Sequence, residues 1–258
     1  MSVQGLAVTE EDGVLTLRFD RPEVFNALSG EMVLGVCEAL ERANSRDDVR
    51  VVVLTGSGPA FSTGADIGGD DAAQRFDVRA LDVANRMIRA IVECHKPVIA
   101  GVNGVAAGVG LSAALACDLA VATESASFLL AFARVGLMPD GGASATVAAA
   151  IGRPRAMRMA MLAEPLSAPD AHAAGLISHL AADADYQAEL ASVVKRVRHG
   201  APLGLTATKR AINQASLAAL EPALEYERDT QTMLLRTADV AEGMAAFSQK
   251  RHPRFCGE

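Results

Sequence analysis

The chain has 258 residues, of which 50% are hydrophobic and 21% charged, with a formal net charge of −7 at pH 7. This composition is ordinary for a compact enzyme and excludes a disordered chain, and the length suffices for one large domain or two small ones. The acidic balance argues against a nucleic-acid partner, because a duplex binder needs a basic surface to displace counterions.

The four cysteines predict neither a metal site nor a disulfide framework. They are widely spaced, with no C-x-x-C motif and no histidine at ligand spacing: Cys37, Cys94, Cys117 and Cys256. The N-terminus lacks a charged and apolar leader, and no apolar run reaches the length of a membrane span. We therefore expect a cytoplasmic protein with reduced thiols, no metal and no membrane partner.

Strand and helix patterns alternate over the first two-thirds of the chain. Apolar, β-branched runs predict strands at 14–19, in "VRVVVLTG", in "KPVIAGV" and in "CDLAVAT". Ser29 is expected to cap a helix with an apolar face, and residues 76–91 predict a second helix. This alternation indicates an α/β fold.

From residue 168 onward the pattern is almost entirely helical. Ser167 and Asp170 have the spacing of a capping box, and Gly175 is a stop signal. Further helices are expected over 185–198, 202–217 and 221–250, the last with a break near Thr237. These helices pack either on the α/β core or on a partner subunit, and their periodicity does not distinguish the two.

Two glycine-rich loops each follow a predicted buried strand: "TGSGPAFSTGADIGG" and "VNGVAAGVG". Glycine lets the backbone approach a ligand closely, and a loop that leads into a helix leaves N–H groups unpaired. Two such loops on neighbouring strands can direct their N–H groups at one oxygen atom, which is an oxyanion hole.

Other chemistries of glycine loops fit less well. Gly56 and Gly58 are followed by Phe61 where a dinucleotide fingerprint needs its third glycine, and no Walker A lysine follows either loop. The segment "GLSAA" lacks the last glycine of a nucleophile elbow. A purely structural strand-to-helix turn stays open for both loops.

Five segments together resemble the crotonase (enoyl-CoA hydratase/isomerase) superfamily, in the right order and over almost the whole chain. They are "RPEVFNALS", "VVVLTGSGPAFSTGADI", "KPVIAGVNGVAAGVGLSAALACDLAVATESASF", "VGLMPDGGAS" and "KRHPRF". The resemblance implies a spiral of repeated ββα units in residues 1–200, and a helical C-terminal region in 201–258 for CoA contacts and trimer packing. It also implies an acyl-CoA thioester substrate, with coenzyme A as part of that substrate and no separate cofactor, and a homotrimer or dimer of trimers.

The same resemblance implies the residues of the site. The thioester oxygen is expected between the backbone N–H groups of Ala65 and Val109, although many members have glycine where this chain has Val109. The other expected substrate and CoA contacts are Ala27, Asp66, Ile67, Gly68, Gly108, Ser112, Phe132 and Lys250. For Asp66, fixing its own loop is an alternative role, and for Lys250 a solvated basic tail is the alternative.

The acids at the site decide which reaction it can run. The two positions that carry glutamate in hydratases fall on Ser112 and Phe132, and hydration needs one carboxylate to activate water and another to protonate carbon. The remaining acid is Asp140, in "LMPDGG". Taken alone, Asp140 is best interpreted as the cap of a helix that starts near Ala143. With the resemblance, it is the expected proton carrier.

Three functions follow, and the first is favoured. The chain is expected to be an enoyl-CoA isomerase that shifts a double bond through a thioester enolate, with Asp140 carrying the proton. The second is a hydratase-like lyase that uses Asp140 with a water ordered by Ser112. The third is a catalytically weak acyl-CoA binding protein, suggested by the missing glutamates and by Val109. Phe132 is expected to fill part of an apolar acyl pocket.

Overall fold

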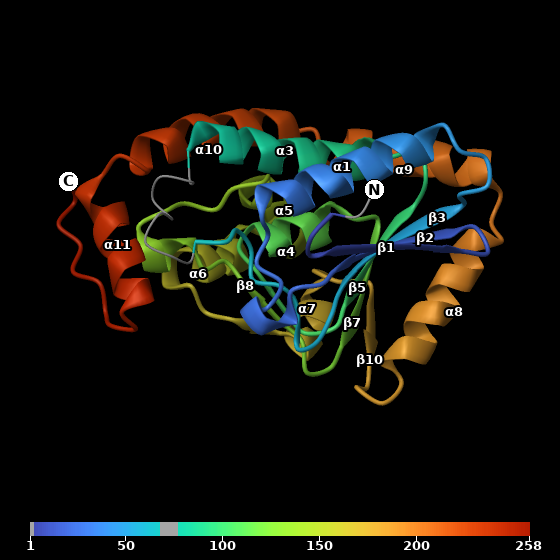
Figure 1. The fold of residues 1–258 in the computed structure, drawn as a ribbon, viewed down its shortest axis with the longest axis horizontal. Helices are drawn as coiled ribbons and strands as arrows, with labels where there is room; N and C mark the ends of the chain where they lie inside the picture. Colours follow the sequence, from blue (N-terminus) through green and yellow to red (C-terminus); the bar gives the residue numbers. More distant parts are fainter. Residues whose placement is uncertain (1–2, 68–76) are drawn as a thin grey trace.

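The computed structural model describes residues 3–67 and 77–258, which form two β-sheets with helices around them (Figure 1). The larger sheet has the strand order β1-β2-β3-β5-β7-β10. Its strands are β1 (Leu6–Glu11), β2 (Val14–Phe19), β3 (Val51–Gly56), β5 (Val98–Val102), β7 (Leu119–Thr123) and β10 (His179–Ala181). β1 and β2 are antiparallel, and the remaining neighbours in this sheet are parallel.

The smaller sheet repeats the order of the larger one. Its strands, in spatial order, are β4 (Ala60–Ser62), β6 (Val105–Ala107), β8 (Ser127–Leu129) and β9 (Leu166–Ser167). β3, β5 and β7 of the larger sheet are each followed by a short strand of the smaller sheet and then by a helix. This succession is the repeated ββα unit expected from the sequence, and the α/β class is confirmed.

The helices lie on both sides of the larger sheet. In chain order the described helices are η1 (Pro22–Val24), α1 (Gly30–Asn44), α3 (Val78–Glu93), α4 (Val109–Ala116), η2 (Phe132–Val135), α5 (Ala143–Ile151), α6 (Arg153–Leu162), α7 (Ala168–Ala174), α8 (Tyr186–Arg198), α9 (Pro202–Ser216), α10 (Leu220–Leu234) and α11 (Ala238–Ser248). Figure 1 shows α1 and α3 on one side of the larger sheet and α8 on the other. None of the described helices is long and apolar enough to cross a membrane.

Side chains of β3 alternate between two cores, because successive residues of a strand face opposite sides of the sheet. Val52 and Leu54 belong to the main core, which includes residues of α1 and α3, whereas Val51 and Val53 belong to a smaller core with α8. The unbroken apolar run of this strand is therefore explained by burial on both faces, as expected of a central parallel strand.

Several boundaries match the sequence expectations. The Ser29 hydroxyl accepts a hydrogen bond from the Met32 N–H at the start of α1, and Thr237 caps α11 at the predicted break. The expectation failed to include β1, β10 and the strands of the smaller sheet. β1 is mostly exposed, and its second half is polar (Thr9, Glu10 and Glu11). The other strands span two or three residues, too few for a period to be recognised.

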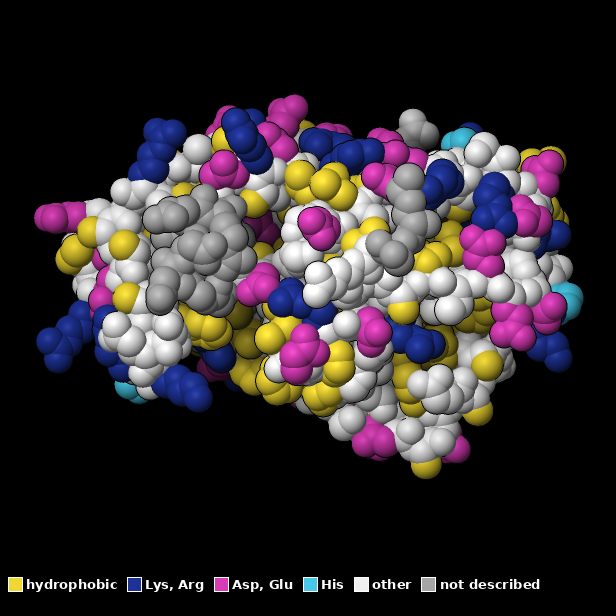
Figure 2. Space-filling view, viewed as in Figure 1, with side chains coloured by type: hydrophobic (Ala, Val, Ile, Leu, Met, Phe, Trp, Pro, Cys, Tyr) yellow, Lys and Arg dark blue, Asp and Glu magenta, His cyan; other side chains and the backbone are white. Residues whose placement is uncertain are grey.

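The C-terminal helices pack on the core of their own chain. α10 contacts α3 and α5 through the buried Leu220 and Leu224, and α11 packs against η2, where Gly243 lies against Val135. Figure 2 shows acidic and basic side chains interspersed along the edge formed by α3 and α10, where Arg89 pairs with Glu221. Separate domains for residues 1–200 and 201–258 stay a prediction.

Candidate active site

The two glycine-rich loops meet at Gly64. Its φ is +92°, and a Cβ atom added there would lie 2.9 Å from Ala107 O and 3.2 Å from Val109 N. A residue with a side chain would therefore separate the loops, and only glycine allows this approach. The contact brings the next residue, Ala65, beside the start of α4. Neither Ala65 N–H nor Val109 N–H donates a hydrogen bond to another described residue.

The start of α4 favours negative charge near these N–H groups. Gly108 precedes the helix with φ +54°, and the first helical N–H groups have no partner within the helix. The aligned peptide dipoles of a helix place a partial positive charge at this end. Val109 as a residue is buried, and in such low-dielectric surroundings a hydrogen bond to a ligand oxygen is stronger than in water.

The loop that carries Ala65 is fixed by neighbouring backbone and side-chain contacts. Leu28 N donates to Gly64 O over 2.8 Å, and Asp66 N donates to Leu28 O over 3.1 Å. Arg21 Nη1 lies 2.9 Å from Asp66 Oδ2 and donates to Ala27 O over 2.8 Å. The Asp66 side chain thus ties its loop to the segment that contains Ala27, in line with the loop-fixing alternative.

Two further predicted contacts belong to this loop. Ile67 packs against the main core, and Gly68 lies outside the described residues.

Asp140 is a buried acid with an unused acceptor. Asp140 is only 5% exposed, and its Oδ2 accepts a hydrogen bond from Gln231 Nε2 over 3.0 Å. Oδ1 is buried and has no hydrogen-bond partner among the described residues. Burial raises the pKa of Asp140 to about 7, the Gln231 hydrogen bond acts to lower it, and the charge of Glu227 adds to the rise.

Asp140 does not cap α5, so the capping interpretation is wrong. Gly142 is the N-cap residue of α5 and provides no side chain. The cap comes from α10, where the Glu227 carboxylate accepts hydrogen bonds from Gly142 N (2.6 Å) and Ser144 N (3.0 Å). A carboxylate from a distant helix thus leaves the Asp140 side chain available for another role.

The Asp140 segment packs on the start of α4. The Ser112 hydroxyl, in a residue 1% exposed, donates to Asp140 O over 2.7 Å. A Cβ atom added at Gly141 would lie 3.3 Å from Val109 Cγ2. Gly141, the residue after Asp140, therefore lies against the side chain of Val109.

Phe132 and Lys250 occupy different positions relative to this cluster. Phe132 is buried in η2, and its ring tip lies 3.9 Å from a Cβ atom added at Gly108, so it borders the start of α4. Lys250 is exposed in the segment that follows α11, and no described contact joins it to the other predicted residues. The structure thus brings Ala65, Val109, Ser112, Phe132 and Asp140 together, with Lys250 apart.

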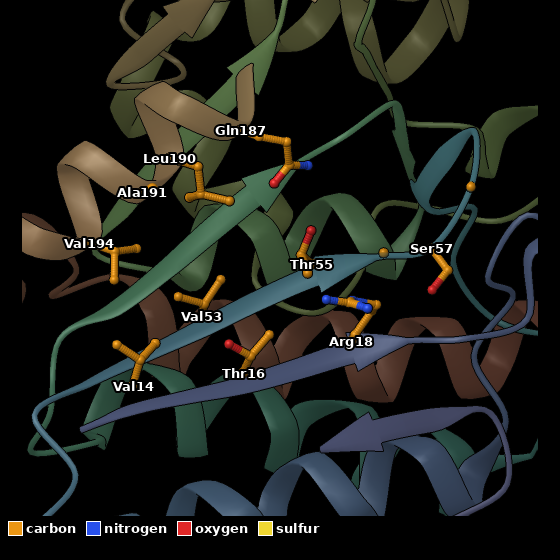
Figure 3. Close-up of a pocket in the computed structure, with 12 residues that line it drawn as sticks. Val14, Thr16, Arg18, Val53, Thr55, Ser57, Gln187, Leu190, Ala191 and Val194 are labelled. Atoms are coloured by element: carbon orange, nitrogen blue, oxygen red, sulfur yellow. The ribbon is translucent and has the colours of Figure 1, made fainter. Parts of the chain in front are cut away.

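A cavity of about 510 Å³ lies elsewhere, between the larger sheet and α8 (Figure 3). Figure 3 shows Thr16 and Arg18 of β2, Val53 of β3 and Leu190 and Val194 of α8 around it. Val53 and Val194 belong to the small core, whereas Val109 and Phe132 belong to the main core across the sheet. This open groove is therefore separate from the cluster around Asp140.

Sequence reasoning missed Glu227 and Gln231, although their spacing carries a signal. They continue the buried stripe of Leu220 and Leu224 at helical intervals, and both are fully buried. A polar residue on an apolar stripe requires a polar partner inside the protein, because burying it unpaired is costly. The described residues contain no group of three or more His, Cys, Asp or Glu side chains placed to hold a metal ion.

Comparison with known proteins identifies the family. Residues 9–258 match the family described as Enoyl-CoA hydratase/isomerase. The chain belongs to this family. The resemblance noted in the sequence is thereby confirmed. The predicted site residues all lie within the matched range of 9–258.

Named relatives align with all or nearly all of this chain. It is 38% identical over 259 residues to a probable enoyl-CoA hydratase of Rhodobacter capsulatus, covering 100% of both chains. It is 36% identical to a 1,2-epoxyphenylacetyl-CoA isomerase of Escherichia coli, covering 96% of this chain and 97% of the relative. Since one relative is called a hydratase and the other an isomerase, the relatives do not decide between the two reactions.

A solved structure supports the same fold. An enoyl-CoA hydratase from Mycobacterium avium subsp. paratuberculosis superposes with a TM-score of 0.93 at 44% identity, covering 99% of this chain and 100% of that chain. The spiral of ββα units is thus the fold of the family.

Proposed function

We propose that this enzyme isomerises enoyl-CoA thioesters, with Asp140 as the proton carrier and the N–H groups of Ala65 and Val109 as the oxyanion hole. The observation that carries the proposal is that Asp140 Oδ1 is buried without a hydrogen-bond partner among the described residues, in a segment whose backbone packs on the start of α4 at Ser112 and Val109. A carboxyl whose pKa is near 7 can both accept and return a proton at neutral pH.

The reaction moves one proton and one double bond. The Asp140 carboxylate removes a proton from C2 of a 3-enoyl-CoA, and the electron pair passes into the thioester as an enolate. The two backbone N–H groups stabilise the enolate oxygen, each contributing about 3 kcal/mol in the transition state. Protonated Asp140 then delivers its proton to C4, so that the double bond moves from C3–C4 to C2–C3 and the carboxylate is regenerated.

The neighbouring polar groups favour isomerisation over hydration. The Ser112 hydroxyl donates to Asp140 O, and the Glu227 carboxylate is occupied by the N-terminus of α5. A second carboxylate that could activate water is therefore missing among the described neighbours of Asp140. Phe132 supports an apolar acyl group next to Gly108, and Lys250 remains our candidate for a CoA phosphate contact.

Turnover of a 3-enoyl-CoA by wild type and Asp140→Asn tests the proposal. The amide keeps the shape but cannot take a proton, so turnover should fall about 100- to 10,000-fold while acyl-CoA still binds. Melting temperature and acyl-CoA affinity serve as controls. Near-normal turnover in the folded variant would contradict the role of Asp140.

The product distinguishes the alternatives. A hydroxyl in the product, detected by mass, would favour the hydratase-like lyase. Binding of acyl-CoA by wild type without turnover of 2-enoyl or 3-enoyl thioesters would favour the binding protein.

The proposed homotrimer or dimer of trimers draws support from exposed apolar side chains on the C-terminal helices. They are Leu203 and Ile212 on α9, Tyr226 and Met233 on α10, and Phe247 on α11. Exposed apolar surface of this kind is typical of an interface between copies. A monomer in sedimentation at micromolar concentration would contradict it.

A further inference from the structure

Helix α10 holds the loop that carries Asp140 through Gln231. The Gln231 side chain is fully buried, and its Oε1 accepts a hydrogen bond from Met138 N over 3.1 Å. Its Nε2 donates to Met138 O over 2.9 Å and to Asp140 Oδ2 over 3.0 Å. Both N–H bonds of this amide are therefore used, one on the backbone and one on the Asp140 carboxyl.

Glu227, one helical turn before Gln231, holds the other end of the same loop. Its carboxylate accepts from Gly142 N and from both the N–H and the hydroxyl of Ser144. Below the loop, the Ser112 hydroxyl of α4 donates to Asp140 O. The backbone on each side of Asp140 is thus fixed, and its side chain has a single hydrogen-bonded oxygen.

Docking of the helix does not by itself require the contact to the carboxyl. The two hydrogen bonds with Met138 already anchor the helix to the loop, so the contact to the carboxyl is an additional one. The third hydrogen bond fixes Oδ2 and leaves Oδ1 as the unbonded oxygen of Asp140. An amide also cannot take up the proton that Asp140 carries.

The charged surroundings of Asp140 are few. α4 and α5 contain no titratable side chain, and on η2 the guanidinium of Arg134 donates to Ala163 O. From α10, Glu227 faces Asp140 and acts on its pKa, whereas Arg228 pairs with Asp82 on the exposed side. Gln231 and Glu227 are therefore the α10 groups that act on the ionisation of Asp140.

We propose that Gln231 is a positioning residue for proton transfer, which holds Oδ2 of Asp140 so that Oδ1 is presented to the substrate. The inference rests on the proposed function of Asp140, and it assigns a part of the active site to the C-terminal helical region. Gln231 and Glu227 act in opposite directions on the carboxyl, because a donor favours its charged form and a neighbouring negative charge opposes it.

The pH profile of kcat with a 3-enoyl-CoA tests this proposal. In Gln231→Met, the acid limb should move to higher pH by about 1–2 units, the size expected for the loss of a hydrogen bond to a charged group. Turnover should therefore fall at pH 7 and recover at higher pH, with KM little changed. Glu227→Gln should move the same limb to lower pH. Gln214→Met, an exposed glutamine on α9, is the matched control and should keep the wild-type profile.

If Gln231→Met does not fold, a second variant provides the same pH test. Gln231→Glu retains the acceptor for Met138 N but removes the donor to Asp140 and adds a negative charge, so the limb should again move upward. A wild-type pH profile in the folded Gln231 variant, whatever its stability, overturns the positioning role. Retained turnover in Asp140→Asn instead overturns the proposed function, so the two failures are distinguishable.

Discussion

Two aspartates of this chain, one half-buried and one buried, show how differently one side chain can be used. Asp118, just before β7, has its Oδ2 2.9 Å from Lys209 Nζ and accepts a hydrogen bond from Val98 N over 2.7 Å. Among the described residues no cation acts on Asp140, and one of its oxygens has no hydrogen-bond partner. Burial raises the pKa of both acids, and Lys209 opposes that rise for Asp118.

The comparison indicates that hydrogen-bond and ion-pair partners help to separate a structural acid from a reactive one. A buried carboxylate that is paired with a cation and a backbone N–H is stable as an ion. A buried carboxylate with a single amide donor can change its protonation state near neutral pH, which is the property a proton carrier needs.

Removing the Lys209 cation should lower the stability of the protein, because Asp118 then lacks its positive partner. In Lys209→Met, the half-buried Asp118 loses its positive partner, so the free energy of unfolding should fall by about 3–5 kcal/mol. Urea unfolding measures the change, and Lys195→Met on the exposed face of α8 is the control. Turnover per folded molecule should remain. A loss below about 1 kcal/mol would show that the pair contributes little.

The pH dependence of stability should reveal Asp140. Its folded-state pKa of about 7 lies above the ordinary value of 3.8, so the folded state binds the proton more tightly than the unfolded state. That contribution is fully present below pH 4 and is lost as the pH rises to about 7. Wild type should therefore lose about 2–4 kcal/mol relative to Asp140→Asn between pH 4 and pH 8. Parallel stability curves for the two proteins would contradict this.

The smallest expected effect concerns Lys250, which is exposed on the tail after α11. If Lys250 binds a CoA phosphate electrostatically, Lys250→Ala should weaken acyl-CoA binding up to about fivefold, the range of an exposed ion pair. The loss of affinity should be larger at low salt. Lys195→Ala removes an equal charge from α8 as the control. Equal acyl-CoA affinity in the Lys250 variant and in wild type would show that Lys250 belongs to a solvated basic tail without a contact to CoA.

The sequence predicted the parts of the site that depend on backbone geometry. Glycine-rich loops after buried strands predicted the meeting of the Ala65 and Val109 segments, because parallel strands bring the following loops to one edge of the sheet. Periodicity predicted α10 and α11 with their break.

The surroundings of Asp140 could not be predicted in the same way. The cap of α5 comes from Glu227, 85 residues from Gly142 along the chain. Nothing local distinguishes a buried glutamate on an apolar stripe from an exposed one until the loop that it binds is known. Gln231, which donates to Asp140 Oδ2, could not be predicted for the same reason, since its partner is fixed by tertiary packing and not by local spacing.

Exchange of the acyl-CoA C2 proton with solvent tests most directly whether Asp140 carries the proton. In deuterated buffer, NMR or mass spectrometry follows deuterium entering C2 of a saturated acyl-CoA, which can form the enolate but has no double bond to move. Wild type and the folded Lys209→Met variant should exchange this proton, and exchange should be at least about 100-fold slower in Asp140→Asn with acyl-CoA still bound. Exchange at the wild-type rate in Asp140→Asn would show that another group removes the C2 proton.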